Sequence, residues 1–426
     1  MAKTFLVSSN TAFGSSTANT TAYIPPIGSS PNTTLNNVED NAKALLRTPG
    51  TLSGLNINIH SNSVSGGTST VVLRINGANA NNTLSIGAST TGQFLDTSST
   101  DTISAGDIID IAFTPGAAAG TVTVGSSKLA FDTNASATST VSRVGAFSAS
   151  PNSSTTSNNS TYYFSLFGVD VSTNTNEANT QVQQNYAGTF KNMAIKVTTN
   201  SRANTTTVRF RKNTANGNMN IPISAGTTGW FEDTTNTDTV AVNDLCNFSL
   251  SMGAGTVAFA HTGILADYET TTNPGTGQLG LGYFTTVSFN KATTGYMAFS
   301  GRLGTDANES KQQTKVNDAY TFKGIGIRLS ANTVTATSHM IFRVNSTDTA
   351  LDVSMAASTT GWFTDTSHNI TTTDGDLVNM KLATGATGTS ITMTAAVLYT
   401  EIAGTVTDID MTPNLITLQN KFITKI

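Results

Sequence analysis

The chain has little charge and almost no cysteine. Of its 426 residues, 11% are Asp, Glu, Lys or Arg, less than half of the roughly 25% that is usual in soluble domains. A single cysteine, Cys246, excludes a disulfide framework within the chain. The net charge is −4 and no run of Lys or Arg occurs. Because neutralising phosphates requires a basic patch, direct binding to nucleic acid is not expected.

Long apolar segments are also missing. No uninterrupted apolar stretch approaches the roughly 18–20 residues that span a bilayer, so we expect no membrane partner. The first ten residues hold one Lys and a short apolar run before the sequence turns polar, which is too short for a signal-peptide core. We therefore expect the protein to be made in a cytoplasm without a signal peptide.

Sequence signals of catalysis are missing as well. The four histidines recur at no equivalent position and show no metal-ligand or triad spacing, and no phosphate-binding glycine loop exists; they are His60, His261, His339 and His368. The sequence predicts a protein that is not an enzyme and has no cofactor and no catalytic residues.

What the chain does contain is Thr, Ser, Asn and Gly, in three copies of one pattern. Thr favours strands, and Asn and Gly favour turns. The copies are Val71–Asp107, Val208–Asp244 and Met340–Asp376, offset by 137 and 132 residues without an internal gap. Units this long are whole domains, since solenoid repeats run to about 20–50 residues. We predict domains at 1–137, 138–275 and 276–404, followed by a tail at 405–426.

Each copy ends in a strand with alternating apolar and polar residues. In the first copy Ile109, Ile111 and Phe113 alternate with polar or small residues, which indicates a half-buried antiparallel strand. Cys246 and Val378 occupy the slot of Ile109, so we interpret Cys246 as a small core residue. The sequence predicts an all-β protein of three tandem antiparallel β-sandwiches, jelly-roll-like, forming a pseudo-trimer. One helix is predicted, at Leu35–Leu46.

Two aspartates recur eleven residues apart in every copy. They are Asp96 and Asp107, Asp233 and Asp244, and Asp365 and Asp376. Paired carboxylates could bind calcium. They lie at turn positions, however, where an Asp side chain bonds to backbone amides, and we favour that structural interpretation over calcium.

An Arg-x-Asn element also recurs, as Arg74 with Asn76, Arg211 with Asn213, and Arg343 with Asn345. A buried arginine needs a partner. We expect each arginine to bind a carboxylate or turn carbonyls of its own repeat. Asp96 or Asp107 could be the partner of Arg74, and the matching aspartates could be those of the other two arginines. The alternative is a surface arginine that binds a carboxylate or a sugar.

Trp230 and Trp362 occupy matched slots where the first copy has Gln93. Matched aromatic residues beside a turn usually pack on a sheet. If exposed, they could stack on a sugar ring, and they are the candidates for glycan binding.

The order of these features resembles known families. A strand with Arg-x-Asn is followed by a polar loop, a glycine, an aromatic residue, Asp-Thr, a turn Asp and an alternating strand. This order resembles trimeric jelly rolls of the complement-globular-head and tumour-necrosis-factor type. It also resembles the β-domains of tailed-bacteriophage virion proteins, such as capsid decoration, head-fibre and tail-fibre proteins. The resemblance implies a virion location, threefold symmetry and synthesis in a host cytoplasm.

From these features we predict a virion structural protein that decorates or cements a threefold or quasi-threefold site of a phage capsid. Its partners would be capsid or other virion proteins. The alternatives are a receptor- or glycan-binding fibre or spike, which needs Trp230 and Trp362 exposed to a host glycan, and a bacterial adhesin or surface-layer module.

Overall fold

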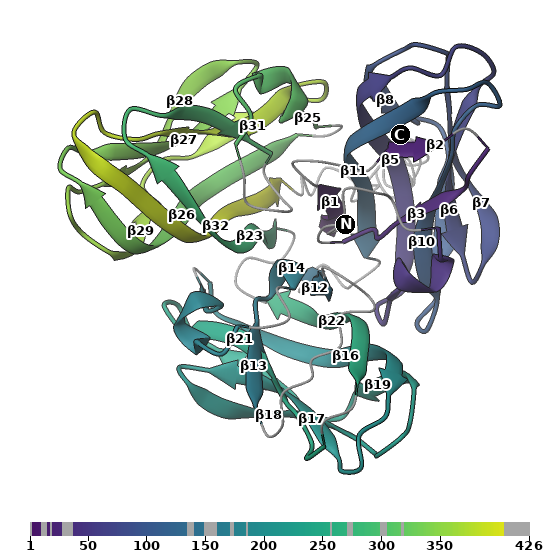
Figure 1. Ribbon diagram of the computed structural model, residues 1–426, viewed down its shortest axis with the longest axis horizontal. Helices are drawn as coiled ribbons and strands as arrows, with labels where there is room; N and C mark the ends of the chain where they lie inside the picture. Colours follow the sequence, from purple (N-terminus) through teal and green to yellow (C-terminus); the bar gives the residue numbers. More distant parts are fainter. Residues whose placement is uncertain are drawn as a thin grey trace, which may run out of the picture.

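The computed structural model describes residues 2–9, 15–17, 19–27, 37–133, 140–148, 160–170, 174–184, 186–255, 258–270, 276–298, 305–316 and 319–403. Within them the strands form three two-layered sandwiches (Figure 1). The tail predicted at 405–426 lies outside the described residues. The domain boundaries after residues 137, 275 and 404 stay predictions.

Sandwich 1 contains one 3-10 helix and eleven strands. They are β1 (Ala2–Ser9), β2 (Ser15–Thr17), β3 (Ala22–Ile24), η1 (Glu39–Asn41), β4 (Ala44–Leu45), β5 (Gly50–Asn62), β6 (Ser69–Ile75), β7 (Ala78–Ile86), β8 (Gly92–Leu95), β9 (Thr100–Ile103), β10 (Ile108–Thr114) and β11 (Thr121–Thr133).

In its described residues, sandwich 2 repeats this order with two differences: it has no counterpart of β2, and it gains the strand β14. Its elements are β12 (Thr140–Ser148), β13 (Thr161–Phe164), β14 (Phe167–Asp170), η2 (Glu177–Asn179), β15 (Val182–Gln183), β16 (Gly188–Asn200), β17 (Thr206–Lys212), β18 (Ala215–Ile223), β19 (Gly229–Asp233), β20 (Asp238–Val240), β21 (Leu245–Ser251) and β22 (Phe259–Thr270).

The described residues of sandwich 3 have the same order without counterparts of β2 and β14. Its elements are β23 (Thr276–Asn290), β24 (Thr294–Met297), η3 (Glu309–Lys311), β25 (Thr314–Lys315), β26 (Tyr320–Val334), β27 (Ser338–Val344), β28 (Thr347–Met355), β29 (Gly361–Asp365), β30 (Ile370–Thr372), β31 (Leu377–Ala383) and β32 (Gly388–Ala403).

The strand order within each sandwich is that of a jelly roll. One sheet of sandwich 1, here called the inner sheet, has the order β1-β11-β5-β8; the other, the outer sheet, has the order β3-β10-β6-β7. Two four-stranded antiparallel sheets with consecutive strands crossing between them are the jelly-roll arrangement. The inner sheets β12-β22-β16-β19 and β23-β32-β26-β29 and the outer sheets β13-β21-β17-β18 and β24-β31-β27-β28 follow the same path. The predicted fold class is therefore confirmed.

Each core lies between the two sheets of its sandwich. The matched strands β10, β21 and β31 contribute Ile109, Cys246 and Val378, and each of the three side chains is fully buried. The predicted common core slot is therefore confirmed. The repeated glycine before the aromatic residue is required by the backbone, because Gly92, Gly229 and Gly361 have φ of +104°, +112° and +108°, a region that side-chain-bearing residues rarely adopt.

The three sandwiches form a ring, with β1 and β23 close to its centre (Figure 1). Strands β1, β12 and β23 contact one another there. Sandwich 2 breaks the symmetry: β14 pairs in parallel with β12 and also contacts β23. It is an exception in an otherwise antiparallel set of sheets.

The prediction of a helix at Leu35–Leu46 is wrong for the residues of this range that the structure describes. Residues 35 and 36 lie outside the described residues, and the rest forms the 3-10 helix η1 and the short strand β4. Val38, Ala42 and Leu45 have a helical spacing, but Val38 is half exposed while Ala42 and Leu45 are buried. Leu45 reaches the core because β4 pairs with β10.

Candidate functional site

Each sandwich carries a short turn that docks on the next sandwich. This docking turn comprises the 3-10 helix and the short strand after it: residues 39–45 in sandwich 1, 177–183 in sandwich 2 and 309–315 in sandwich 3. Docking turn 1 lies on the inner sheet of sandwich 2, docking turn 2 on that of sandwich 3, and docking turn 3 on that of sandwich 1. The contacts run in one direction around the ring and close after three.

One backbone carbonyl in each docking turn accepts a hydrogen bond from the next sandwich. Leu45 O accepts from Arg143 Nε at 3.1 Å, Gln183 O from the Tyr399 hydroxyl at 2.9 Å, and Lys315 O from Lys128 Nζ at 2.6 Å. The acceptors are equivalent residues, since each lies at the end of the short strand paired with β10, β21 or β31. The donors are three different residue types.

A second contact comes from matched positions on the inner sheets. Asn58, Lys196 and Arg328 each lie opposite the slot of Gln93 or the two tryptophans. Asn58 Nδ2 donates to Gln313 O at 3.2 Å, Lys196 Nζ to Asp40 O at 3.2 Å, and Arg328 to Asn179 Oδ1 at 3.4 Å. All three acceptors lie in the docking turn of the preceding sandwich.

The Arg-x-Asn arginines hold these docking turns in place. Arg211 donates from Nε to Glu177 at 2.6 Å, Arg343 to Glu309 at 2.7 Å, and Arg74 to Glu39 at 3.2 Å. Each arginine also donates to a carbonyl of the hairpin that follows its own strand, at Gly77, Thr214 or Ser346. A planar guanidinium can bind both at once, so it connects the 3-10 helix to the hairpin.

The predicted binding of each arginine to a carboxylate and to turn carbonyls of its own repeat is confirmed. The repeated aspartates suggested as partners were wrong, because the carboxylates are those of Glu39, Glu177 and Glu309. These glutamates recur with offsets of 138 and 132 residues, nearly those of the arginines. That recurrence is a signal that could have identified them. It lies in the front half of each repeat, where the copies are otherwise dissimilar.

The Asn and the closing Asp of each repeat form a pair across the hairpin. Asn213 Nδ2 donates to Asp244 at 2.6 Å, and Asn76 and Asn345 do the same to Asp107 and Asp376. The asparagines have φ between 48° and 53°, in the left-handed region that Asn tolerates. The hydrogen bond from the backbone amide of Thr373 lowers the pKa of Asp376 most, and weaker hydrogen bonds lower this pKa further.

The other aspartates close the loop after β8, β19 and β29. Asp96 accepts hydrogen bonds from the backbone amides of Thr83, Ser98 and Ser99. Although partial burial acts to raise its pKa, these bonds lower the pKa of Asp96 to about 2. Asp233 and Asp365 accept equivalent bonds. The turn interpretation thus fits all six aspartates, and the described residues contain no cluster of three or more His, Cys, Asp or Glu able to hold a metal ion.

The two tryptophans are half-buried between sandwiches. Trp230 is half-buried against the core of sandwich 1, and Trp362 against that of sandwich 2. The matched Gln93 donates to Gln313 O of sandwich 3 at 2.8 Å. All three side chains therefore lie at the junctions between sandwiches, and the assignment of Trp230 and Trp362 to a glycan site stays a prediction.

Cys246 and the histidines form no common site. Burial raises the pKa of the Cys246 thiol, which leaves it unreactive. His60 lies against docking turn 3, His261 packs against Phe164, and His339 and His368 each contact a separate aspartate. Among the described residues, no helix is long and apolar enough to cross a bilayer.

Comparisons with known proteins found similarity among solved structures. No protein-family model and no curated protein matches the sequence. Among solved structures, the chain is similar to one described as the triple jelly roll fold and turret assembly in an archaeal virus. That match has 14% identity, 85% of this chain and 82% of the other covered, and a TM-score of 0.18. It is also similar to a chain from the atomic structure of Sulfolobus turreted icosahedral virus, with 15% identity, the same coverages and a TM-score of 0.16.

Both similar chains come from archaeal viruses, and the first is itself described as a triple jelly roll. The resemblance to tailed-bacteriophage proteins stays a prediction. Identities this low concern the fold alone, and at these TM-scores the likeness supports no argument about function.

Proposed function

We propose that the chain is a structural protein of a virus particle, and that it decorates or cements a threefold or quasi-threefold position of the shell. The observation that carries the proposal is the closure of the ring. Three jelly rolls dock head to tail through equivalent turns, so that one chain presents three similar faces around one axis. Contacts of this one-directional kind close into a ring only when the rotation between units fits.

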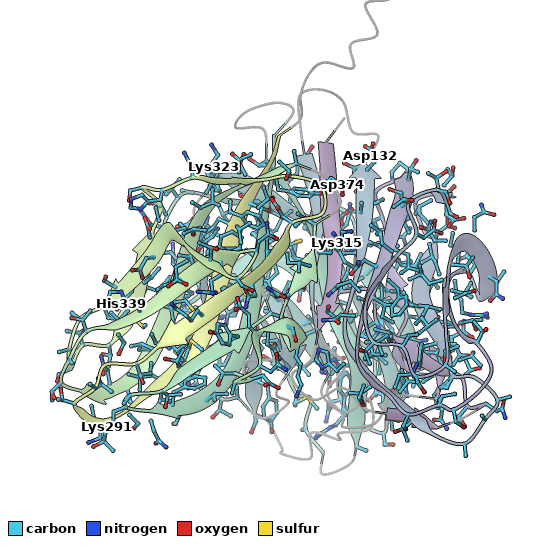
Figure 2. The ribbon with its side chains drawn as sticks, turned by 90° about the horizontal axis from the view of Figure 1, so that it is seen from above. Asp132, Lys291, Lys315, Lys323, His339 and Asp374 are labelled. Atoms are coloured by element: carbon cyan, nitrogen blue, oxygen red, sulfur yellow. The ribbon has the colours of Figure 1, made fainter. Side chains whose placement is uncertain are left out.

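The shape of the ring suits attachment to a surface. Seen from the side, Asp132 at the end of β11 and Lys323 in β26 lie at one rim, and Lys291 lies at the opposite rim (Figure 2). The first rim is therefore built from more than one sandwich, so that several sandwiches can contact a shell together. Contacts that form together strengthen attachment steeply, because the later ones form at high effective concentration.

The residues that offered other functions have structural roles in the ring. The repeated arginines brace the docking turns, the aspartates accept turn amides, and the tryptophans pack between sandwiches. This use of the residues supports a scaffold over a glycan-binding spike.

Co-sedimentation with shells that lack the protein tests the proposal. We expect binding at low and high ionic strength alike, because a chain with 11% charged residues makes mostly uncharged contacts. A variant lacking residues 276–426 loses one of three faces, and its binding should fall by far more than a third. The proposal would be refuted if the intact chain failed to co-sediment at both low and high ionic strength. Glycan binding abolished by Trp230→Ala and Trp362→Ala would replace it with the spike.

A further inference from the structure

Two of the three junctions between sandwiches contain buried apolar contacts in addition to their polar ones. At the junction of sandwiches 1 and 2, Ala194 and Leu265 of sandwich 2 belong to the buried apolar cluster of sandwich 1, and Trp230 packs against it. At the junction of sandwiches 2 and 3, Ala395, Val397 and Tyr399 of sandwich 3 belong to the cluster of sandwich 2, with Trp362 packed against it. In both places apolar side chains of one sandwich's inner sheet pack against the core of the preceding sandwich.

The third junction, between sandwiches 3 and 1, is polar; we call it the seam. The sandwich 1 side of the seam includes Asn56, Asn58, Gln93, Ser126 and Lys128, next to His60. Asn58 lies opposite Ser126 on β11 and opposite Gln93 on β8, and Asn56 lies opposite Lys128. Directly opposed residues of antiparallel strands point to the same face, so the five side chains form one patch.

The same positions in the other sandwiches are largely apolar. By strand register, Asn56 corresponds to Ala194 and Gly326, Lys128 to Leu265 and Val397, and Ser126 to Gly263 and Ala395. The buried apolar cluster of sandwich 3 contains no described residue of sandwich 1. Among the described residues, the seam therefore lacks the buried apolar contacts that the other two junctions have.

Several buried polar atoms of this patch have no protein partner. They are both side-chain polar atoms of Asn56, which is fully buried, together with Gln93 Oε1 and Ser126 Oγ. An unpaired buried amide or hydroxyl is costly, and ordered water is the usual partner where the surroundings are polar. Docking turn 3 supplies carbonyl oxygens beside them, at Lys311 and Gln313.

We propose that the seam is hydrated and that the ring opens there. The polypeptide itself joins sandwich 1 to sandwich 2 and sandwich 2 to sandwich 3, whereas the seam is held by non-covalent contacts alone. Water already present in the seam replaces the lost hydrogen bonds when the faces part. The other two junctions expose apolar surface on opening, which water disfavours. Opening moves docking turn 3 away from the inner sheet of sandwich 1.

Thiol labelling of the intact chain under native conditions tests the proposal. Ser126→Cys and Ala395→Cys place a small thiol at matched positions, one in the seam and one in the junction of sandwiches 2 and 3. Each starting residue is buried, so labelling requires opening. The natural Cys246 is fully buried in a core and provides the slow background. We expect Ser126→Cys to be labelled on the order of tenfold faster than Ala395→Cys.

The dependence on denaturant separates local opening from unfolding. Below the unfolding transition, labelling of Ser126→Cys should change little with urea, because opening the seam exposes a small area. Equal rates for the two variants would overturn the proposal. The proposal would also be overturned if labelling of Ser126→Cys depended on urea as steeply as global unfolding does, even if the substitution had lowered stability.

Reciprocal exchange of one residue supplies a matched control. Asn56→Ala introduces the residue of sandwich 2 and should slow labelling of Ser126→Cys by several-fold, because it removes the polar atoms that attract water into the closed seam. Ala194→Asn makes the opposite change at the junction of sandwiches 1 and 2 and should leave labelling at Ser126→Cys unchanged. Faster labelling with Asn56→Ala would show that Asn56 holds the seam closed, and would count against opening at a hydrated seam.

Discussion

The two faces of each inner sheet have diverged to different degrees among the three sandwiches. The face toward the core keeps its residue types, as the matched and fully buried Ile57, Ile195 and Ile327 show. The face toward the neighbouring sandwich does not, since Asn58 corresponds to Lys196 and Arg328. A core requires only apolar residues of suitable volume. A junction requires the residue that fits one particular partner, and different junctions give the three sandwiches a fixed order around the ring.

The largest effect is expected at the junction of sandwiches 1 and 2. Arg143 and Asp267 form an ion pair at 2.9 Å, with each side chain 1% exposed. Arg143→Ala leaves the Asp267 carboxylate buried without its cation, and should lower the free energy of unfolding by about 3–5 kcal/mol. Urea denaturation measures the change.

Arg47→Ala is the control for that substitution. Its pair with Glu232 crosses the same junction, but the side chains are 29% and 20% exposed. We expect a loss of about 1 kcal/mol or less. Equal losses for the two variants would show that burial of the pair does not decide its contribution.

The tryptophan slots come next. Trp230→Gln and Trp362→Gln introduce the residue that sandwich 1 has in the same slot, Gln93. Each should lower the free energy of unfolding by about 1.5–3 kcal/mol, the loss expected for a large apolar side chain removed from a junction. Denaturation midpoints measure it. An unchanged midpoint in either variant would contradict packing as the role of that tryptophan.

Replacing the Arg-x-Asn arginines should lower the free energy of unfolding by a smaller amount, and by a similar amount in all three sandwiches. Arg211→Ala removes the bonds to Glu177 and to the hairpin carbonyl, at a cost of about 1–3 kcal/mol. Arg74→Ala and Arg343→Ala should each cost an amount in the same range. Arg211→Lys keeps the charge without the forked geometry and should recover only part of the loss. A large loss confined to one sandwich would contradict an equivalent role.

The smallest effect is expected at a buried position where sandwich 1 has a different residue type from the other two sandwiches. Asp110 on β10 is fully buried, whereas the matched residues are Asn247 and Asn379. Burial, and then the charge of Glu39, raise the pKa of Asp110 to about 7 against the opposing effect of Arg74. A raised carboxyl pKa means that the folded state binds this proton more tightly than the unfolded chain. Its contribution to stability is present below about pH 4 and is lost as the pH rises towards 7.

Asp110→Asn therefore should raise stability at pH 8 by about 1–2 kcal/mol, with little change at pH 4. Unfolding midpoints at pH 4, 6 and 8 measure the effect. A gain that is independent of pH would assign it to packing rather than to ionisation.

The sequence predicted those parts of the structure that the repeats share. The alternating strands gave the jelly-roll cores, and the Arg-x-Asn and Asp positions gave the hairpin turns, because the same physical requirement recurs in every copy. The partner of Arg211 was missed because Glu177 lies 34 residues upstream, in the dissimilar front half of its repeat. The junction residues Arg143, Lys128 and Tyr399 could not have been predicted, since each bonds to a backbone carbonyl of another sandwich and has no repeated counterpart.

Electron cryo-microscopy of purified particles tests the central claim most directly, namely that three jelly rolls close into one ring that serves as a unit of a virus shell. The account predicts a three-lobed density at threefold or quasi-threefold positions, with one rim toward the shell and the lobes joined head to tail. Three separated lobes strung along the surface, or particles that lack the protein, would contradict it.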